Sequence, residues 1–415
     1  MTLNNKVITF GCRLNIFESQ IIKDNIKIAG INNSTIINTC AVTNEAERQA
    51  RQAIRKERAN NPNAKIIVTG CSAQLNPEIY ANMVEVDQVF GNNEKLHLGN
   101  YKKEEKILVN DIMAVKDQSY FLATNFFRRT RAFLEIQNGC NHRCTFCTVP
   151  YARGNSRSVP IGLIVDNITS IIKHGYKEIV FTGVDITDYG KDLPGNPSLG
   201  QMIKRVLNLV PELKRLRLSS IDVAEIDDNL LDLFKTESRL MPHIHLSLQS
   251  GDNLILKRMK RRHNREQVLD FCHTIRNHNK DVAFGADIIA GFPTEKEEAF
   301  INTVDLIKKA DIQYLHVFPY SARKNTPASR MPQVTHLDKK KRAKFLRDLK
   351  KSQIKKFLLK NLGNVKNVLL EKDNYGHSDN FIEVFLENKG IKGNIVAVEF
   401  IDINNKNEMK GRILQ

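Results

Sequence analysis

Several features that would assign this 415-residue chain to other protein classes are missing from it. No apolar run approaches the ~18 residues that a membrane helix needs. The first residues, MTLNNKVITFGC, show no basic segment followed by an apolar one, as a secretory signal would. Internal repeats and low-complexity segments are also missing. We therefore expect a globular protein of the cytoplasm that does not engage a membrane.

Acidic residues are outnumbered by basic ones. Lys and Arg total 63 against 46 Asp and Glu, which gives a formal net charge of +17. Such an excess favours a polyanionic partner, because basic side chains gain free energy by displacing counterions from phosphates. A solvated basic surface would give the same count, so charge alone leaves nucleic-acid binding open.

Disulfide bonds are not expected, since the chain has only seven cysteines, an odd number. Three of them, Cys12, Cys40 and Cys71, each follow a short strand-like run (KVITF, TIIN and KIIVT) and precede a helix-like segment. Parallel strands end at one edge of a sheet, so three thiols placed in this way can converge on one metal cluster. The alternative is three buried cysteines that act as small apolar residues.

A second set of cysteines, Cys140, Cys144 and Cys147, has the spacing C-x3-C-x2-C and follows the strand-like run AFLEIQ. Thiolates bind [4Fe-4S] clusters, and three of them leave one of the four irons open to a substrate or cofactor. A structural zinc ion normally takes four ligands, for which His142 is poorly spaced. The spacing predicts an iron–sulfur cluster, with zinc as the alternative.

The order of strand-like and helix-like segments predicts an α/β protein in three parts. Residues 1–105 alternate in the manner of a doubly wound parallel sheet. Residues 126–357 contain six strand candidates separated by helices, as in a partial or complete β/α barrel: 132–137, 178–182, 216–219, 243–248, 282–290 and 314–318. A basic helix over 336–361 follows. Strands at 368–371, 381–386 and 395–401 predict a small β-barrel in residues 360–415, of a kind that often binds RNA.

The motifs of nearly the whole chain resemble one family. The string QNGCNHRCTFCTVPYARG and the three N-terminal cysteines are similar to those of methylthiotransferases in the radical S-adenosylmethionine superfamily. FGCRLNIFES, TGCSAQ, LSLQSGD and DIIAGFPTE add to the resemblance, and the terminal β-barrel resembles a TRAM domain. The string NTCAVTNEAERQAR most resembles the branch that acts on N6-threonylcarbamoyladenosine in tRNA. Asn325 and Asp222 depart from the pattern, which more often has Gly and Glu there.

This resemblance implies two [4Fe-4S] clusters, on Cys12, Cys40 and Cys71 and on Cys140, Cys144 and Cys147, with S-adenosylmethionine at the second. It implies that Thr182, Gly183 and Asp185 line the cofactor site, and that Gln249, Ser250 and Asp287 contribute at other strand ends. An ordinary strand-to-loop turn would explain any one of these six equally well. No side chain is predicted to be catalytic, because the clusters carry the chemistry.

The function implied is radical methylthiolation of carbon 2 of N6-threonylcarbamoyladenosine at tRNA position 37. The expected partners are tRNA and an electron donor such as a flavodoxin or ferredoxin. Lysines and arginines in 257–262 and 339–356 are candidates for contacts with tRNA phosphates. A solvated helix face would show the same runs of basic residues. Three alternatives stay open: a methylthiotransferase for N6-isopentenyladenosine, a non-catalytic iron–sulfur RNA-binding protein, and a zinc-bound RNA-interaction protein.

Overall fold

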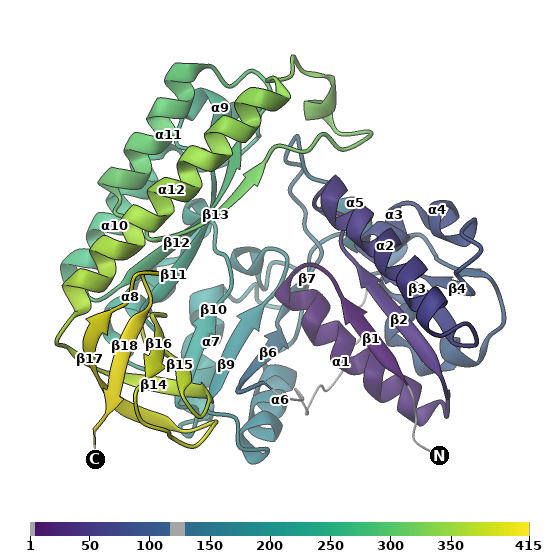
Figure 1. Cartoon of the computed structure of the whole chain (residues 1–415), viewed down its shortest axis with the longest axis horizontal. Coiled ribbons are helices and arrows are strands. Elements are labelled where there is room, and N and C mark those ends of the chain that lie inside the picture. The colour runs from purple at the N-terminus through teal and green to yellow at the C-terminus, as the bar shows by residue number, and fades with distance from the viewer. Residues whose placement is uncertain (1–4, 117–128, 415) are drawn as a thin grey trace.

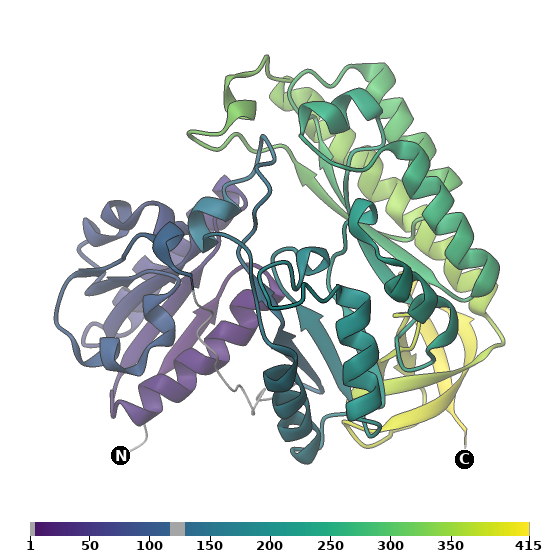
Figure 2. The same cartoon turned by 180° about the vertical axis from the view of Figure 1, so that it is seen from behind.

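The computed structural model describes residues 5–116 and 129–414. It consists of an N-terminal sheet with its helices, a central set of six strands with helices, and a small C-terminal β-barrel (Figure 1). Both views place the N-terminal part beside the central strands and the C-terminal barrel beyond one end of them (Figure 2). The boundary expected at residue 126 lies outside the described residues, and the three domain ranges stay predictions.

The N-terminal sheet has five parallel strands in sequential order, as expected for an α/β domain. Helix α1 (Arg13–Ile28) packs Ile22 and Ile26 against Ile36 of the sheet, while α2 (Asn44–Asn60) packs against the neighbouring Ile37. Successive strand residues point to opposite faces, so the two helices cover opposite sides. The strands are β1 (Lys6–Thr9), β2 (Ser34–Thr39), β3 (Lys65–Gly70), β4 (Gln88–Phe90) and β5 (Ile107–Leu108), with short helices α3 (Cys71–Leu75) and α4 (Pro77–Ala81).

The central part is a partial barrel, which confirms the expected fold class. Its six parallel strands form two three-stranded sheets, ordered β10-β9-β6 and β11-β12-β13. The bridges Leu216–Leu240 and Ile221–Leu246 are isolated links between these halves. The strands are β6 (Arg131–Glu135), β9 (Glu178–Thr182), β10 (Arg215–Leu218), β11 (His243–Gln249), β12 (Ala283–Ala290) and β13 (Tyr314–Pro319), beside the short pair β7 (Gln137–Asn138) and β8 (Arg157–Ser158).

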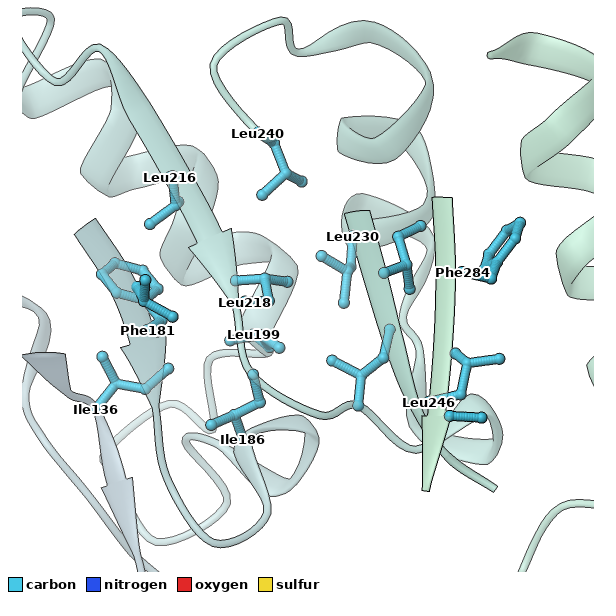
Figure 3. Packing of buried hydrophobic residues seen from close by; sticks show 14 of the residues in the cluster. Ile136, Phe181, Ile186, Leu199, Leu216, Leu218, Leu230, Leu240, Leu246 and Phe284 are labelled. Carbon is cyan, nitrogen blue, oxygen red and sulfur yellow. The ribbon is translucent and has the colours of Figure 1, made fainter. Parts of the chain in front are cut away.

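Helices cover the outer face of these strands. They are α6 (Ile161–Lys173), α7 (Leu199–Leu209), α8 (Asp228–Thr236), α10 (Arg265–His278) and α11 (Glu297–Lys309). Strand residues such as Phe181, Leu218 and Phe284 pack with Leu199 of α7 and Leu230 of α8 in one continuous apolar cluster (Figure 3). Two short helices, α5 (Val149–Arg153) and α9 (Asn253–Arg258), lie outside this apolar cluster. Among residues 5–116 and 129–414, no helix combines the length and the apolar character needed to span a bilayer.

The C-terminal part is a closed barrel in the order β14-β15-β16-β18-β17. It follows α12 (His336–Asn361), whose expected end is confirmed by Gly363 in the left-handed region, with φ +82°. The strands are β14 (Val365–Lys372), β15 (Tyr375–Ser378), β16 (Glu383–Leu386), β17 (Ile395–Ile403) and β18 (Met409–Ile413). The sequence reading missed β15 and β18, and it placed Phe381 in a strand that begins only at Glu383.

Phe381 instead lies in the turn between β15 and β16, with φ +70°, and its partly buried ring docks against the central strands. The ring stacks on His243 at 4.4 Å between centroids, with 16° between the planes. The guanidinium groups of Arg131 and Arg217 lie 5.2 and 5.1 Å from its centroid. Arg217 also donates hydrogen bonds of 2.8 Å to the carbonyls of Ser378 and Asp379. The C-terminal barrel is thereby anchored at the N-terminal ends of the central strands.

Replacing Phe381 by alanine should remove this anchor and lower the free energy of unfolding by roughly 2–4 kcal/mol, through lost burial and lost ring contacts. Urea denaturation followed by circular dichroism measures the change. Phe385→Ala is the matched control, because that ring lies on the same barrel and is 37% exposed. Equal losses for the two variants would contradict an anchoring role for Phe381.

Candidate active site

The three N-terminal cysteines lie at the ends of adjacent strands, as the sequence predicted. Cys12 precedes α1, Cys40 follows β2, and Cys71 begins α3 directly after β3. The register pairs Thr9 with Asn38 and Thr39 with Gly70, so the strand ends are level. The structure thus brings these cysteines to one edge of the sheet.

Glycines let the cysteine loops pass close to neighbouring backbone. Gly70 has φ +98°, and a Cβ there would lie 2.3 Å from the Thr39 carbonyl oxygen. Gly139, before Cys140, has φ +73°, and a Cβ would lie 1.9 Å from the Asn155 carbonyl oxygen. Both positions need the left-handed conformation and the absence of a side chain. The Gly-Cys pairs of the sequence therefore have a steric cause.

The spacing of the sulfur atoms distinguishes a cluster from a single ion. Around a tetrahedral zinc, sulfurs ~2.3 Å from the metal would lie within roughly 4 Å of one another. Within the described part of the chain, no three ligand atoms that include a cysteine sulfur lie within 4.8 Å of one another. In the described residues, neither cysteine set is therefore spaced closely enough to surround one zinc ion.

Burial shapes the chemistry of these thiols. Burial and then the neighbouring Cys71 together raise the pKa of Cys40 to about 12. Burial raises the pKa of Cys147 to about 12 as well. Without a bound cation, thiolates at these positions would be costly. Both sets therefore suit a positively charged metal cluster that compensates the thiolate charge.

The loop of Cys140, Cys144 and Cys147 follows β7 and is held by its backbone. The Cys140 amide donates to the Gly154 carbonyl at 3.0 Å, and the Cys147 amide donates to the Cys144 carbonyl at 3.0 Å. Arg261 brings Nη1 to 3.7 Å from Cys144 Sγ. A cationic donor beside a ligand sulfur stabilises the thiolate.

A buried ion network joins the two cysteine sites. Arg153, in α5 just after the second cysteine set, donates to Glu18 Oε1 at 2.8 Å and to Asn15 Oδ1 at 2.6 Å, both on α1. Lys95 Nζ donates to Glu18 Oε2 at 2.7 Å. The three charged side chains are at most 2% exposed. Burial opposes ionisation of Glu18, but Arg153 and Lys95 outweigh it and lower its pKa.

The two sites face each other across this junction. Cys71 packs with Ala41 and with Ala152 of α5, and the charge of Cys147 interacts with that of Cys71. Asn92 lies between them: its Nδ2 donates to the Ala152 carbonyl at 2.7 Å and lies 3.7 Å from Cys71 Sγ. The two cysteine sets therefore lie on either side of the contact between α5 and the N-terminal part.

Of the predicted cofactor residues, Asp185 lies closest to a cysteine. Its Oδ2 is 3.8 Å from Cys140 Sγ and 3.2 Å from His142 Nε2. The carboxylates of Asp185 and then Glu225, as hydrogen-bond acceptors for the ring, raise the pKa of His142 to about 9. Thr182 is buried at the end of β9, and a Cβ on Gly183 would lie 2.6 Å from the Gln137 carbonyl oxygen.

Of the other three predicted residues, Ser250 and Asp287 have their contacts with other side chains of the central part. Ser250 is buried, with its hydroxyl 3.4 Å from that of Thr303 in α11. Gln249, beside it, ends β11 with φ +69°. Asp287 lies on β12, where hydrogen bonds from His245 and then His316 outweigh burial and hold its pKa well below the usual range. A cofactor role for all six residues stays a prediction.

The two residues that depart from the family pattern both fit their places. Asn325 adopts φ +67°, the conformation for which glycine is favoured. Asp222 is a buried acceptor for Arg261 and Arg262, each at 3.0 Å, and for the ring of His263 at 3.1 Å. Those two arginines were candidates for phosphate contacts, but here both are paired with Asp222.

Sequence reasoning missed Glu18, Lys95 and Arg153. Their signal was present, since Glu18 belongs to FGCRLNIFES and Arg153 to the string after Cys147. A charged residue at a helical position otherwise occupied by apolar side chains indicates a buried pair. Which charges pair across 135 positions of sequence becomes visible only in the fold.

Comparisons with known proteins agree with this geometry. Residues 134–307 match the family described as "Radical SAM superfamily", and residues 4–91 match "Uncharacterized protein family UPF0004". The threonylcarbamoyladenosine tRNA methylthiotransferase MtaB of Rickettsia prowazekii is 56% identical, over 97% of this chain and 96% of that protein. The chain belongs to the radical SAM methylthiotransferases. As an enzyme of this family, it uses S-adenosylmethionine and [4Fe-4S] clusters.

Two more distant relatives and one solved structure are also similar to this chain. MtaB of Aquifex aeolicus is 36% identical over 94% of this chain and 98% of its own length. The tRNA-2-methylthio-N(6)-dimethylallyladenosine synthase of Clostridium tetani is 31% identical over 97% and 87%. The radical S-adenosylmethionine methyltransferase TsrM of Kitasatospora setae has a solved structure with a TM-score of 0.59 at 13% identity, covering 78% of this methylthiotransferase and 76% of that chain. That likeness concerns the fold alone.

Glu18→Gln should destabilise this enzyme by about 3–5 kcal/mol, because it leaves Arg153 and Lys95 buried without a counter-charge. Since the folded pKa of Glu18 is lowered, its stabilisation is present above the unfolded pKa of ~4.3 and is lost as the pH falls. Urea unfolding at pH 7 and at pH 4 measures both effects.

Glu45→Gln is the matched control, because Glu45 forms an exposed pair with Arg48. At pH 7 the control should be nearly as stable as wild type, because an exposed ion pair contributes little. Between pH 7 and pH 4, Glu18→Gln should lose less stability than wild type. A Glu18→Gln protein as stable as wild type at pH 7 would show that the network does not hold the two parts together.

Proposed function

We propose that this enzyme methylthiolates carbon 2 of N6-threonylcarbamoyladenosine at position 37 of tRNA. The relatives named for that activity cover almost the whole chain at up to 56% identity, which supports the choice of substrate. Cys140, Cys144 and Cys147 would hold the cluster that binds S-adenosylmethionine, and Cys12, Cys40 and Cys71 the second cluster. When bound, these groups supply a radical that abstracts hydrogen from an unreactive aromatic carbon, and the sulfur and methyl group that replace it.

The observation that carries the proposal is the meeting of two cysteine sets at one junction. The buried Arg153–Glu18–Lys95 network fixes α1 to α5, and each of these helices adjoins one set. A non-catalytic iron–sulfur protein would have no need for two sites held face to face. Hydrogen abstraction and sulfur insertion at a single carbon require that geometry, since positioning is what the protein contributes.

The tRNA would approach over basic surfaces of the protein. The described side chains of α12 include exposed Lys340, Lys344, Arg347, Lys351 and Lys355, and the chain carries a net charge of +17. Such side chains bind phosphates without reading bases. The anchored C-terminal barrel would extend this surface. A cytoplasmic location and an electron donor such as a flavodoxin or ferredoxin belong to the same proposal.

The alternative substrate, N6-isopentenyladenosine, is separable by experiment. Nucleosides from tRNA of a strain that lacks the gene should contain N6-threonylcarbamoyladenosine without its 2-methylthio form. Complementation with wild type should restore that form, and Cys12→Ala should not. Mass spectrometry of digested tRNA measures each species. Loss of the 2-methylthio form of isopentenyladenosine instead would overturn the choice of substrate.

Iron content tests the two ligand sets. Anaerobically reconstituted wild type should contain roughly eight irons per chain, four per cluster. Replacing Cys140, Cys144 and Cys147 by alanine should leave roughly four, and so should replacing Cys12, Cys40 and Cys71. Cys272→Ala is the control, because that thiol is fully buried in α10 away from both sets. Unchanged iron in either triple variant would refute the assignment.

A further inference from the structure

The face of the partial barrel opposite the helices is polar. Strand residues alternate, so that the neighbours of the apolar positions in Figure 3 point to the other side. Their charged and imidazole-bearing members, hereafter the inner face, are Arg131, Glu135, Glu178, Arg215, Arg217, His243, His245, Asp287 and His316. Of the carboxylates among them, Glu135 accepts a hydrogen bond from Asn138 at 3.2 Å. Barrels of this kind usually fill this space with branched apolar side chains. A polar inner face indicates that it receives a polar ligand.

Arginines outnumber their counter-charges at one end of the inner face. Glu178 accepts from Arg217 at 2.7 Å and lies 3.5 and 3.8 Å from nitrogens of Arg215 and Arg131. Arg131 also pairs with Glu371 of the C-terminal barrel at 2.7 Å. Asp287 has its own partners in His245 and His316. The carboxylates of the inner face are therefore already engaged.

A further arginine reaches this place from the N-terminal part. Arg13 follows Cys12 directly, and α1 packs along β6, beginning near β7 (Figure 1). Its charge interacts with those of Arg131, Arg217, Asp287 and Glu178. Within residues 5–116 and 129–414, its guanidinium has no hydrogen bond or salt bridge. Arg13 is thus a cation that directly follows Cys12 and feels the charges of Glu178 and Asp287 on the inner face without a hydrogen bond to either.

We propose that Arg13 binds the carboxylate of the substrate's threonylcarbamoyl group and thereby selects N6-threonylcarbamoyladenosine over adenosines whose N6 substituent is neutral. This inference rests on the proposed function. A guanidinium without a partner matches a carboxylate through two parallel hydrogen bonds. An isopentenyl group would leave the cation unpaired in a partly buried place, which disfavours that substrate.

Binding measurements test this without turnover. Reconstituted enzyme, without reductant, is titrated with a tRNA anticodon stem-loop bearing N6-threonylcarbamoyladenosine, its threonyl methyl ester, or unmodified adenosine. Wild type should bind the acid roughly 10- to 100-fold more tightly than the ester, the size expected for a charge-assisted hydrogen bond. Arg13→Gln should bind both alike, and Arg13→Lys should recover part of the difference.

Two controls separate this effect from a general loss of charge or fold. Arg48→Gln removes one exposed cation on α2 and should keep the wild-type ratio of acid to ester. Arg13→Gln should bind the unmodified stem-loop as wild type does, with an unchanged circular dichroism spectrum. Arg13→Lys gives a second reading if Arg13→Gln folds poorly, since it keeps the charge but not the paired donors.

The outcomes are distinguishable. Wild-type preference for the acid that persists in Arg13→Gln overturns the inference and leaves the proposed function standing. If wild type methylthiolates the natural substrate but binds acid and ester alike, the role of Arg13 is overturned and the proposed function stands. Wild type that neither prefers the acid nor methylthiolates it overturns the proposed function itself.

Discussion

The arrangement of this enzyme depends on one buried carboxylate. Glu18 receives Arg153 from the central part and Lys95 from the N-terminal part, with all three side chains withdrawn from water. A buried ion group of this kind adds little stability by itself, because the cost of desolvation offsets the attraction. Its value is positional, because one carboxylate ties α1 both to Arg153 of α5 and to Lys95. The relative positions of the two cysteine sites follow from that restriction.

Much of this arrangement follows from strand ends. Each cysteine set, Asp185 and the end of β11 lie where a parallel strand gives way to a loop, and backbone there is free to approach a ligand. The opposite ends of the central strands are occupied by Phe381 and the C-terminal barrel. One end of the strands thus carries the cysteine loops, and the other is covered by the C-terminal barrel.

The sequence was sufficient for local features and insufficient for distant contacts. Runs such as EIVFT and the spacing C-x3-C-x2-C are contiguous, so the central strands and six cysteines could be assigned. The strands β15 and β18 were missed because they are short and their residues lack a run of apolar or β-branched side chains. The docking of Phe381, the inner face and the pairing of Glu18 with Arg153 arise from residues far apart in the chain. In the sequence, charged residues that alternate with apolar ones in RAFLE and RLRL indicated a polar inner face.

The edge strand β6 of the central part needs protection from other chains. Because β6 is the last strand of its half-sheet, it carries backbone groups without a strand partner, and α1 packs along it. Bare edges of this kind promote aggregation. Because α1 covers this edge, the N-terminal part shields the backbone groups of β6 from pairing with a strand of another molecule.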